Sequence, residues 1–324
     1  METLSTGHLF AGIDGLGLGL EPHGFRTAWF SEYEDAPSRV LAHHYPYVPN
    51  HGDITAIDWS KVEPVEVLTG GFPCQDLSYA GKGAGIKEGT RSGLWFEYVR
   101  AIRALRPRIV IVENVAALLG RGLDIVLGDL AACGFDASWS VLRASDVGAA
   151  HRRERLFIVA TAAYGGGDRR QRGAERYIGT DRPELEAPLG YHAELRDPTS
   201  ADADLVGRLD RGTGEPDAGV QASDAQGRGP ARRDWIADLA GRPLDYGPAI
   251  RRWERTTGRA APAPTIDGRL SAQFVEWHMG FPDGWVDVLS RTQALKALGN
   301  AVVPQCANVI GRWALELAAQ QEAA

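Results

Sequence analysis

The chain has 324 residues and a mass of 35.0 kDa, with 44% hydrophobic and 24% charged residues, which is the composition of a soluble globular protein with room for one large and one smaller domain. The formal net charge of −7 excludes a basic coat protein of nucleic acid but not DNA binding, because a local cluster of arginines binds phosphate even on an acidic protein. No apolar stretch approaches the roughly 18 residues of a membrane span, and Cys74, Cys133 and Cys306 lack the spacing of a disulfide framework or zinc site, so we expect a cytoplasmic protein without metal or membrane partner.

Up to about residue 161, short apolar runs alternate with glycine, proline or aspartate and then with helical patterns. The apolar runs cover residues 9–11, 27–30, 65–68, 109–112, 139–142 and 156–159, and helices are expected over 94–104 and 125–133. This alternation is typical of a mostly parallel sheet with helices on both faces. The sequence therefore predicts a doubly wound α/β domain.

The composition changes between residues 164 and about 263, where glycine, arginine, aspartate and proline dominate and aliphatic runs are few. We expect this part to be a small irregular domain, ordered in part by a partner. Regular patterns return from Pro264, with helices predicted over 271–279 and 305–321. The predicted division is one domain of residues 1–163 plus 265–324, and a second domain of residues 164–264.

A glycine-rich turn, Phe-Ala-Gly-Ile-Asp-Gly at residues 10–15, leaves the first apolar run. Such a turn lets the backbone approach a ligand closely and opens a helix whose first N–H groups are free. Glu32 stands 20 residues after Gly12, where nucleotide-binding sheets place an acid for the ribose hydroxyls. Asp53 is a further candidate, as an acceptor for an adenine amine. The alternative interpretation is tight packing at the glycines and solvated surface acids.

Three more polar segments lie at the ends of apolar runs. Cys74 follows a Gly-Gly-Phe-Pro turn after the run at 65–68, and Glu113 follows the run at 109–112. Because parallel strands end at the same rim, we expect this thiol and this carboxyl to share one pocket. Arg152, Arg153 and Arg155 reach the same rim from the start of the last run, where they can clamp phosphate or polarise a ring carbonyl. The alternatives are an inert buried thiol, an exposed acid and a solvated charge cluster.

Taken together and in this order, the segments resemble the DNA cytosine-5 methyltransferases. The first matching block covers residues 7–161, with FAGIDG, Glu32, GDI, GFPCQ, ENV and RRER. The second block covers residues 269–305, with RLSxxFxEWxMGFP and GNAVVPQ. Six ordered motifs with matching spacing make the resemblance specific, although a single PCQ tripeptide would recur by chance.

The resemblance implies a seven-stranded, Rossmann-like methyltransferase sheet, S-adenosyl-L-methionine as donor and a cytosine flipped out of double-stranded DNA as acceptor, and thus a DNA (cytosine-5-)-methyltransferase. It makes Cys74 the nucleophile, lets Glu113 contact the N3 edge of cytosine, and assigns Arg153 and Arg155 to the base and its phosphate. The donor site is implied to be lined by Phe10, Gly12, Gly15, Glu32, Asp53, Pro73, Leu94, Asn300 and Val302. Gln75 and Ser78 are implied to belong to a loop that closes over the base, and residues 164–264 to the target-recognition domain.

The sequence departs from the family pattern at three positions. The family often has aspartate where His8 stands, glycine where Asp14 stands, and glutamine where His151 stands. Three alternatives to DNA methylation stay open: action on RNA cytosine, transfer of a group other than methyl, and a DNA-binding homologue without catalysis. A monomer is expected, and a cognate restriction endonuclease is a further partner consistent with the resemblance.

Overall fold

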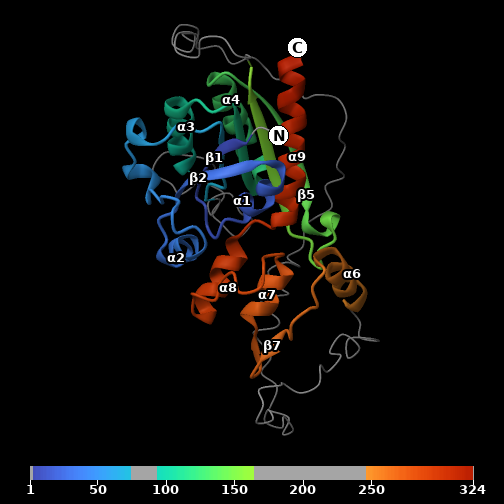
Figure 1. Cartoon of the computed structure of the whole chain (residues 1–324). Coiled ribbons are helices and arrows are strands. Elements are labelled where there is room, and N and C mark those ends of the chain that lie inside the picture. The colour runs from blue at the N-terminus through green and yellow to red at the C-terminus, as the bar shows by residue number, and fades with distance from the viewer. Residues whose placement is uncertain (1–2, 74–92, 164–245, 324) are drawn as a thin grey trace.

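The protein is built around one large sheet, seen in the computed structural model, which describes residues 3–73, 93–163 and 246–323 (Figure 1). The strands are β1 (Leu4–Leu9), β2 (Phe25–Ser31), β3 (Val67–Gly70), β4 (Ile109–Val115), β5 (Phe135–Arg143) and β6 (Glu154–Ala162), in the order β2-β1-β3-β4-β6-β5. The first four of these, β2-β1-β3-β4, pair in parallel, and β6 runs antiparallel to both β4 and β5. A separate hairpin joins β7 (Thr265–Ile266) to β8 (Arg269–Leu270). The predicted α/β class is therefore confirmed.

The described sheet has six strands, whereas the resemblance implied seven. β6 pairs directly with β4 along the whole of that strand, from Ile109 opposite Thr161 to Val115 opposite Arg155. The other edge of β6 pairs with β5 over its whole length, from Phe135 opposite Ala162 to Arg143 opposite Glu154. Both edges of β6 are thus hydrogen-bonded to neighbours, and within the described ranges no further strand enters this sheet.

The helices agree with the sequence periodicity where it was strong. They are α1 (Gly15–Leu20), α2 (Asp35–His44), α3 (Leu94–Leu105), α4 (Leu123–Ala132), α6 (Gly247–Thr257), α7 (Ala272–His278), α8 (Arg291–Asn300) and α9 (Pro304–Ala323), with short 3-10 turns at Glu21–His23, Ile54–Ala56, Trp59–Lys61, Ala116–Gly120 and Ala144–Val147. The predicted helices at 94–104, 125–133, 271–279 and 305–321 are confirmed as α3, α4, α7 and α9. Gly134, with φ 85°, supplies the left-handed turn after α4. No helix in the described ranges combines the length and apolar character that a membrane span needs.

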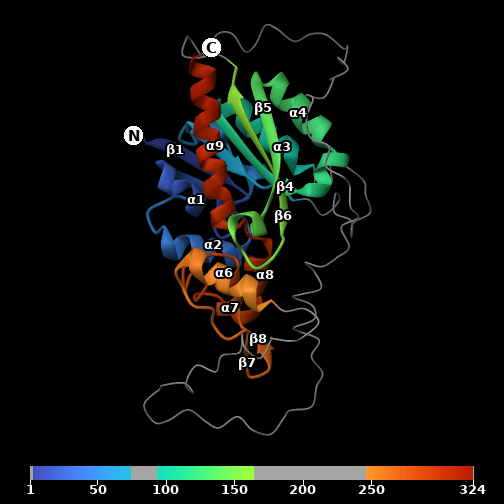
Figure 2. The ribbon, with the colours of Figure 1, turned by 90° about the vertical axis from the view of Figure 1, so that its right-hand side faces the viewer.

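The two faces of the sheet carry separate cores, as alternation along a strand requires. On β4, Ile109 and Ile111 pack into the core beneath α1 and α9, whereas Val110 and Val112 pack beneath α3 and α4. Figure 2 shows α9 on one side of the strands and α4 on the other. Burial on both faces explains why the strand reads as a continuous apolar run.

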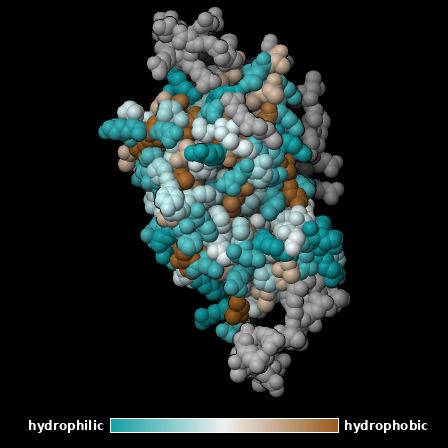
Figure 3. Space-filling model, viewed as in Figure 1, coloured by the Kyte–Doolittle hydropathy of each residue, from teal (hydrophilic) through white to brown (hydrophobic). Residues whose placement is uncertain are grey.

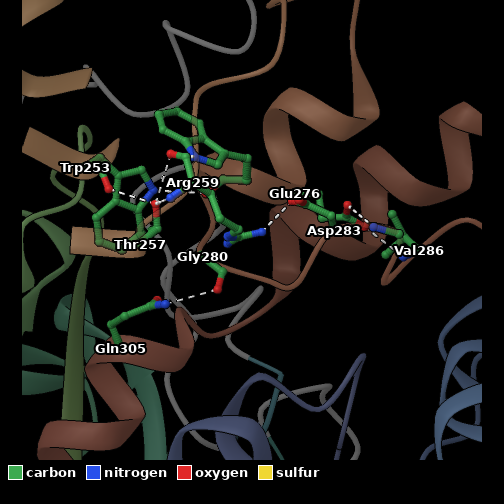
Figure 4. Close-up of polar contacts among 10 residues, drawn as sticks. Trp253, Thr257, Arg259, Glu276, Gly280, Asp283, Val286 and Gln305 are labelled. Atoms are coloured by element: carbon green, nitrogen blue, oxygen red, sulfur yellow. Dashed lines mark hydrogen bonds and ion pairs between the residues drawn. The ribbon is translucent and has the colours of Figure 1, made fainter. Parts of the chain in front are cut away.

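Helix α6 belongs to the core of the large domain. Trp253 is completely buried in the same cluster as Phe157 of β6, and its indole Nε1 donates to the Trp277 carbonyl of α7 at 3.0 Å (Figure 4). The core therefore includes residues that precede the domain boundary predicted at 264. Most of the expected second domain, residues 164–245, lies outside the described residues, and the boundary stays a prediction.

The large side chains left exposed are scattered. They are Tyr33, Tyr47, Leu119, Tyr246 and Ile266. In the view of Figure 3, the hydrophobic residues among those described form small spots separated by hydrophilic ones. Isolated exposed apolar residues are normal on a soluble protein. This face of the described part therefore offers no large apolar surface.

Candidate active site

The carboxyl ends of the parallel strands meet at the rim that faces α7 and α8 (Figure 1). In the register, Gly70 at the end of β3 lies beside Leu9 of β1 and Val112 of β4. The segments that leave these three strands are the glycine-rich turn, the segment leading to Cys74 and the Glu-Asn-Val segment. The rim shared by these segments was predicted from the sequence, and the fold provides it.

Glu113 lies at this rim against the segment that precedes Cys74. A β-carbon on Gly71 would lie 2.5 Å from Oε2 of Glu113, so a side chain there would require the carboxyl or the segment to move. The buried Asn114 side chain donates from Nδ2 to the Phe72 carbonyl at 3.0 Å, which holds the next residue of the segment. Cys74 follows two residues later, and it lies outside the described residues together with Gln75 and Ser78.

The Glu113 carboxyl is desolvated and paired with one arginine. Its side chain is 13% exposed, and Oε1 lies 3.1 Å from Nε of Arg155. Burial raises the pKa of Glu113, and the charges of Arg155 and Arg153 oppose that rise without cancelling it. A carboxyl with a raised pKa keeps its proton at a higher pH and can donate it to a base.

Arg153 and Arg155 point to different places. Arg155 pairs with Glu113, and its Nη1 donates to the Glu154 carbonyl at 2.7 Å. Arg153 donates from Nη2 to the carbonyls of Gly299 and Ala301, at 2.9 and 2.6 Å. The resemblance gave both arginines to the base and its phosphate, but within the described residues one faces the acid and the other the turn after α8.

The glycine-rich turn has the backbone of a ligand-binding loop. Phe10, Gly12 and Asp14 adopt left-handed φ values of 51°, 56° and 64°. A β-carbon at Gly12 would meet nothing within 4 Å, so the turn borders open space there. The Gly12 N–H donates to Oε2 of Glu32 at 2.8 Å, and the Glu34 N–H donates to Oε1 of Glu32 at 2.8 Å. Glu32, 8% exposed, is thereby fixed beside the turn, as predicted from its spacing.

The other residues implied to line the donor site surround the same rim. A β-carbon on Gly15 would lie 2.1 Å from the buried Val302 carbonyl oxygen, so Gly15 serves close packing between α1 and the residues before α9. Asn300 is exposed at the last turn of α8, and Pro73 and Leu94 are half-buried on either side of residues 74–92. The Phe10 ring lies 6.5 Å from that of Tyr98.

Asp53 is exposed, and in this structure its carboxylate caps a short turn. Its Oδ1 accepts from the Thr55 backbone N–H at 2.9 Å and from the Thr55 hydroxyl at 2.8 Å. An exposed oxygen with remaining lone pairs can still accept from a ligand amine.

Two of the departures from the family pattern are neighbours below the glycine-rich turn. His8 is buried and its ring nitrogens pair with the hydroxyls of Thr69 and Thr27, at 2.7 and 3.1 Å. Burial lowers the pKa of His8 to about 3 and raises that of Asp14 to about 7. Their side chains approach to 4.0 Å. The two residues that depart from the family pattern, His8 and Asp14, are therefore in contact with each other. Neither position alone indicates this contact.

Sequence reasoning missed the role of Trp285, in the Gly-Phe-Pro-Asp-Gly-Trp turn. Its indole Nε1 donates to the Ile13 carbonyl at 2.8 Å, across 272 positions of sequence. Its ring also stacks on His44 at the end of α2, with centroids 3.7 Å apart and planes 4° from parallel. The glycine-rich turn is thus held by the second block of the sequence. The feature of the sequence that could have indicated this contact is the tryptophan at the end of the turn.

His151, the third departure, packs against α7. Its Nε2 lies 3.0 Å from the His278 carbonyl, and the two rings are 4.5 Å apart. Burial, together with the nearby positive charge of Arg153, lowers the pKa values of both histidines, to about 4 for His278. Both rings are therefore neutral at physiological pH. No group of three histidine, cysteine, aspartate or glutamate residues with metal-binding geometry occurs in the part of the chain that the structure describes.

Comparison with known proteins agrees with this geometry. The family described as C-5 cytosine-specific DNA methylase matches residues 4–167, about half of the chain. The protein belongs to this family. The match includes the glycine-rich turn, Glu113 and both arginines of the rim.

Individual relatives extend the match. The Type II methyltransferase M.NlaIV of Neisseria lactamica is 33% identical over 178 residues, which are 50% of this chain and 42% of that protein. The Type II methyltransferase M.SsoII of Shigella sonnei is 27% identical over 320 residues, 93% of this chain and 77% of that protein. The chain thus spans less than half the length of M.NlaIV. The crystal structure of the S. pombe Dnmt2 methyltransferase matches 97% of this chain and 99% of its own, with a TM-score of 0.56 and 14% identity, which shows the shared fold.

Proposed function

We propose that this C-5 cytosine-specific DNA methylase transfers the methyl group of S-adenosyl-L-methionine to carbon 5 of a cytosine flipped out of double-stranded DNA. The observation that carries the proposal is the contact of Glu113 with Gly71, because Gly71 lies three residues before Cys74. The contact brings an acid of raised pKa to the segment that carries Cys74, the residue that the family resemblance makes the nucleophile. An acid and a thiol at one pocket are what addition to a pyrimidine ring requires.

The glycine-rich turn fits the donor. A nucleoside needs a carboxylate for its ribose hydroxyls. The Glu32 carboxylate accepts from the backbone N–H groups of Gly12 and Glu34, with a further backbone hydrogen bond from Tyr33. A carboxylate has about four acceptor sites, so one remains for a ligand. The open space at Gly12 allows a ligand to approach the backbone. We assign Phe10, Glu32, Asp53, Pro73, Leu94 and Asn300 to this site. When bound, the donor supplies an electrophilic methyl group on a sulfonium sulfur.

The residues of the rim then have separate tasks. The Cys74 thiolate adds to carbon 6 of cytosine and forms a carbon–sulfur bond, while Glu113 holds a proton at N3 and so neutralises the charge that develops on the ring. With the donor held by Phe10, Glu32 and Asn300, the electron pair gained by carbon 5 would take up the methyl group as the bond from methyl to the sulfonium sulfur breaks and the neutral thioether leaves. Loss of the carbon-5 proton to water then breaks the bond to Cys74 and restores the ring. Arg155 keeps Glu113 in position by its ion pair.

Recognition of the DNA sequence is assigned to residues 164–264, from the family organisation. Gln75 and Ser78 are proposed to close over the flipped base. We propose a monomer acting on duplex DNA, with a cognate restriction endonuclease as its functional partner. The target sequence follows from experiment, since base contacts and phosphate contacts of arginines look alike in a sequence.

The test is expression in a host that lacks cytosine methylation, followed by mass spectrometry of nucleosides from its DNA and RNA. We expect 5-methyldeoxycytidine in DNA with the wild-type chain and with Cys133→Ser, a control thiol at the end of α4, but not with Cys74→Ser. Modification that persists in Cys74→Ser contradicts the covalent mechanism. Modified cytidine in RNA alone, or a mass increment other than methyl, contradicts the proposed substrate or donor. Bisulfite sequencing of the same DNA gives the target sequence.

A further inference from the structure

The side chain of Arg153 reaches the turn after α8 from an unusual backbone conformation. The residue adopts φ 35°, an unusual value for a residue other than glycine, just before β6 begins. From there its Nη2 reaches the carbonyls of Gly299 and Ala301, which lie 146 and 148 positions further along the chain. These two carbonyls flank Asn300. A strained backbone that delivers one side chain to one turn indicates a positional function.

The same turn contacts the glycine-rich turn on its other side. The Val302 carbonyl fills the place that a β-carbon on Gly15 would take, at 2.1 Å. The ring of Phe281 also lies close to that place, at 3.1 Å. The residues from 299 to 302 are thus held between Arg153, at the target-base side of the rim, and α1, which opens at the donor side.

The charge of Arg153 suits this position. Gly299 and Asn300 are the last residues of α8, where carbonyls lack helical partners and carry the negative end of the helix dipole. An arginine there satisfies two of these carbonyls with one cation. Its neighbours His151 and His278 are buried and neutral, because burial and the arginine itself lower their pKa values, so neither ring brings a second positive charge beside the guanidinium.

We propose that Arg153 is a positioning residue for the methyl donor: it fixes the Gly299–Ala301 turn so that Asn300 faces the donor, while Arg155 forms the ion pair with Glu113, the acid at the target base. The inference rests on the proposed function, in which Asn300 contacts the donor. It reassigns Arg153 from the base and its phosphate, where the resemblance put it. It also places the two sites close together, because Arg153 lies two positions before Arg155.

The experiment measures S-adenosyl-L-methionine binding by calorimetry with no DNA present. We expect Arg153→Ala to weaken donor binding by at least about tenfold, because two carbonyls lose a charged donor and the turn loses its anchor. Arg153→Lys keeps the charge and one donor, and we expect it to recover part of the loss. In an Asn300→Ala background, Arg153→Ala should change the affinity little, because the arginine acts through that residue.

The matched control is Arg252→Ala. Arg252 also donates to two consecutive backbone carbonyls, those of Gly148 and Ala149 at 3.2 Å each, but away from the donor turn. Its loss should lower the melting temperature without changing donor affinity. Should Arg153→Ala fail to fold, the comparison of Arg153→Lys with wild type, alone and with Asn300→Ala, gives the same decision.

Two results overturn the inference. If Arg153→Ala or Arg153→Lys keeps wild-type donor affinity and loses only DNA affinity, then Arg153 serves the base or phosphate. If the losses from Arg153 and Asn300 variants are additive, the arginine does not act through that turn. Failure of the wild-type chain to bind the donor at all would instead overturn the proposed function together with this inference, so the two failures are distinguishable.

Discussion

The carboxylate of Glu113 occupies the space that a side chain on Gly71 would need, with Oε2 only 2.5 Å from the position of the missing β-carbon. We therefore expect Gly71→Ala to displace either the carboxyl or the segment that leads to Cys74. The rate of methyl transfer in a single turnover should fall by at least about tenfold, since small displacements of catalytic groups cost that much. Donor affinity should change little, because the Gly12–Glu32 contact is separate.

The control is Gly128→Ala in α4, where an added β-carbon would meet nothing within 4 Å. That variant should keep the full rate and gain slightly in stability, since alanine is the better helix former by about 0.5–1 kcal/mol. An unchanged single-turnover rate in Gly71→Ala would show that the contact has no catalytic consequence.

The raised pKa of Glu113 predicts that the rate of methyl transfer depends on pH. Burial raises the pKa of Glu113, so its protonated form, the one able to donate at N3 of cytosine, persists to a higher pH than in an ordinary glutamate. The wild-type single-turnover rate should therefore fall as pH increases through that raised pKa. Glu113→Gln cannot transfer a proton. We expect its rate to be reduced by at least about 10²-fold, and we expect its pH–rate profile to lack the decrease at higher pH. A decrease at higher pH that survives in Glu113→Gln would assign it to another group.

Trp285 offers a test of how the glycine-rich turn is held. Trp285→Phe removes the N–H that donates to the Ile13 carbonyl and keeps a ring to stack on His44. We expect donor affinity to fall about fivefold, the value of one neutral hydrogen bond, with unchanged affinity for DNA. Trp59→Phe is the matched control, because the buried Nε1 of Trp59 has no hydrogen-bond partner among the described residues. Equal effects of the two substitutions would mean that the Trp285 contact is not specific.

The sequence predicted the rim because strand ends are marked locally. Apolar runs followed by polar residues placed Glu32 and Glu113 correctly, since burial on both faces of a parallel sheet leaves a direct compositional trace. The helix α3 was predicted for a similar reason, because its apolar residues recur at helical spacing, and the end of α4 was marked by Gly134.

Contacts between distant parts of the chain could not be predicted in this way. The target of Arg153 depends on a left-handed backbone angle and on a turn 146 positions later, and neither has a local signature. The stacking of His44 on Trp285 is of the same kind. The core position of Trp253 was hidden because it follows a long stretch of loop-like composition, although α6 packs with the large domain.

The contact between His8 and Asp14 below the glycine-rich turn leads to a prediction about stability. Asp14 is buried, faces a neutral His8 and lies near Glu21, so burial raises its pKa to about 7, although hydrogen bonds from Tyr45 and from the Gly17 N–H act in the opposite direction. The unfolded chain has an ordinary aspartate, with a pKa near 3.8. Between these values the folded state binds a proton that the unfolded state has lost, and stability falls as pH rises from about 4 to 7.

Asp14→Asn removes this penalty and keeps the cap on α1, because asparagine also caps helices and tolerates the left-handed φ of 64°. The free energy of unfolding, from urea titrations, should exceed that of wild type by an amount that grows between about pH 4 and 7, to about 4 kcal/mol at most. Asp58→Asn is the control: that exposed cap has a lowered pKa, and its loss should not stabilise the protein at pH 8. A difference between Asp14→Asn and wild type that stays constant with pH would mean that Asp14 ionises in the folded protein as it does in the unfolded chain.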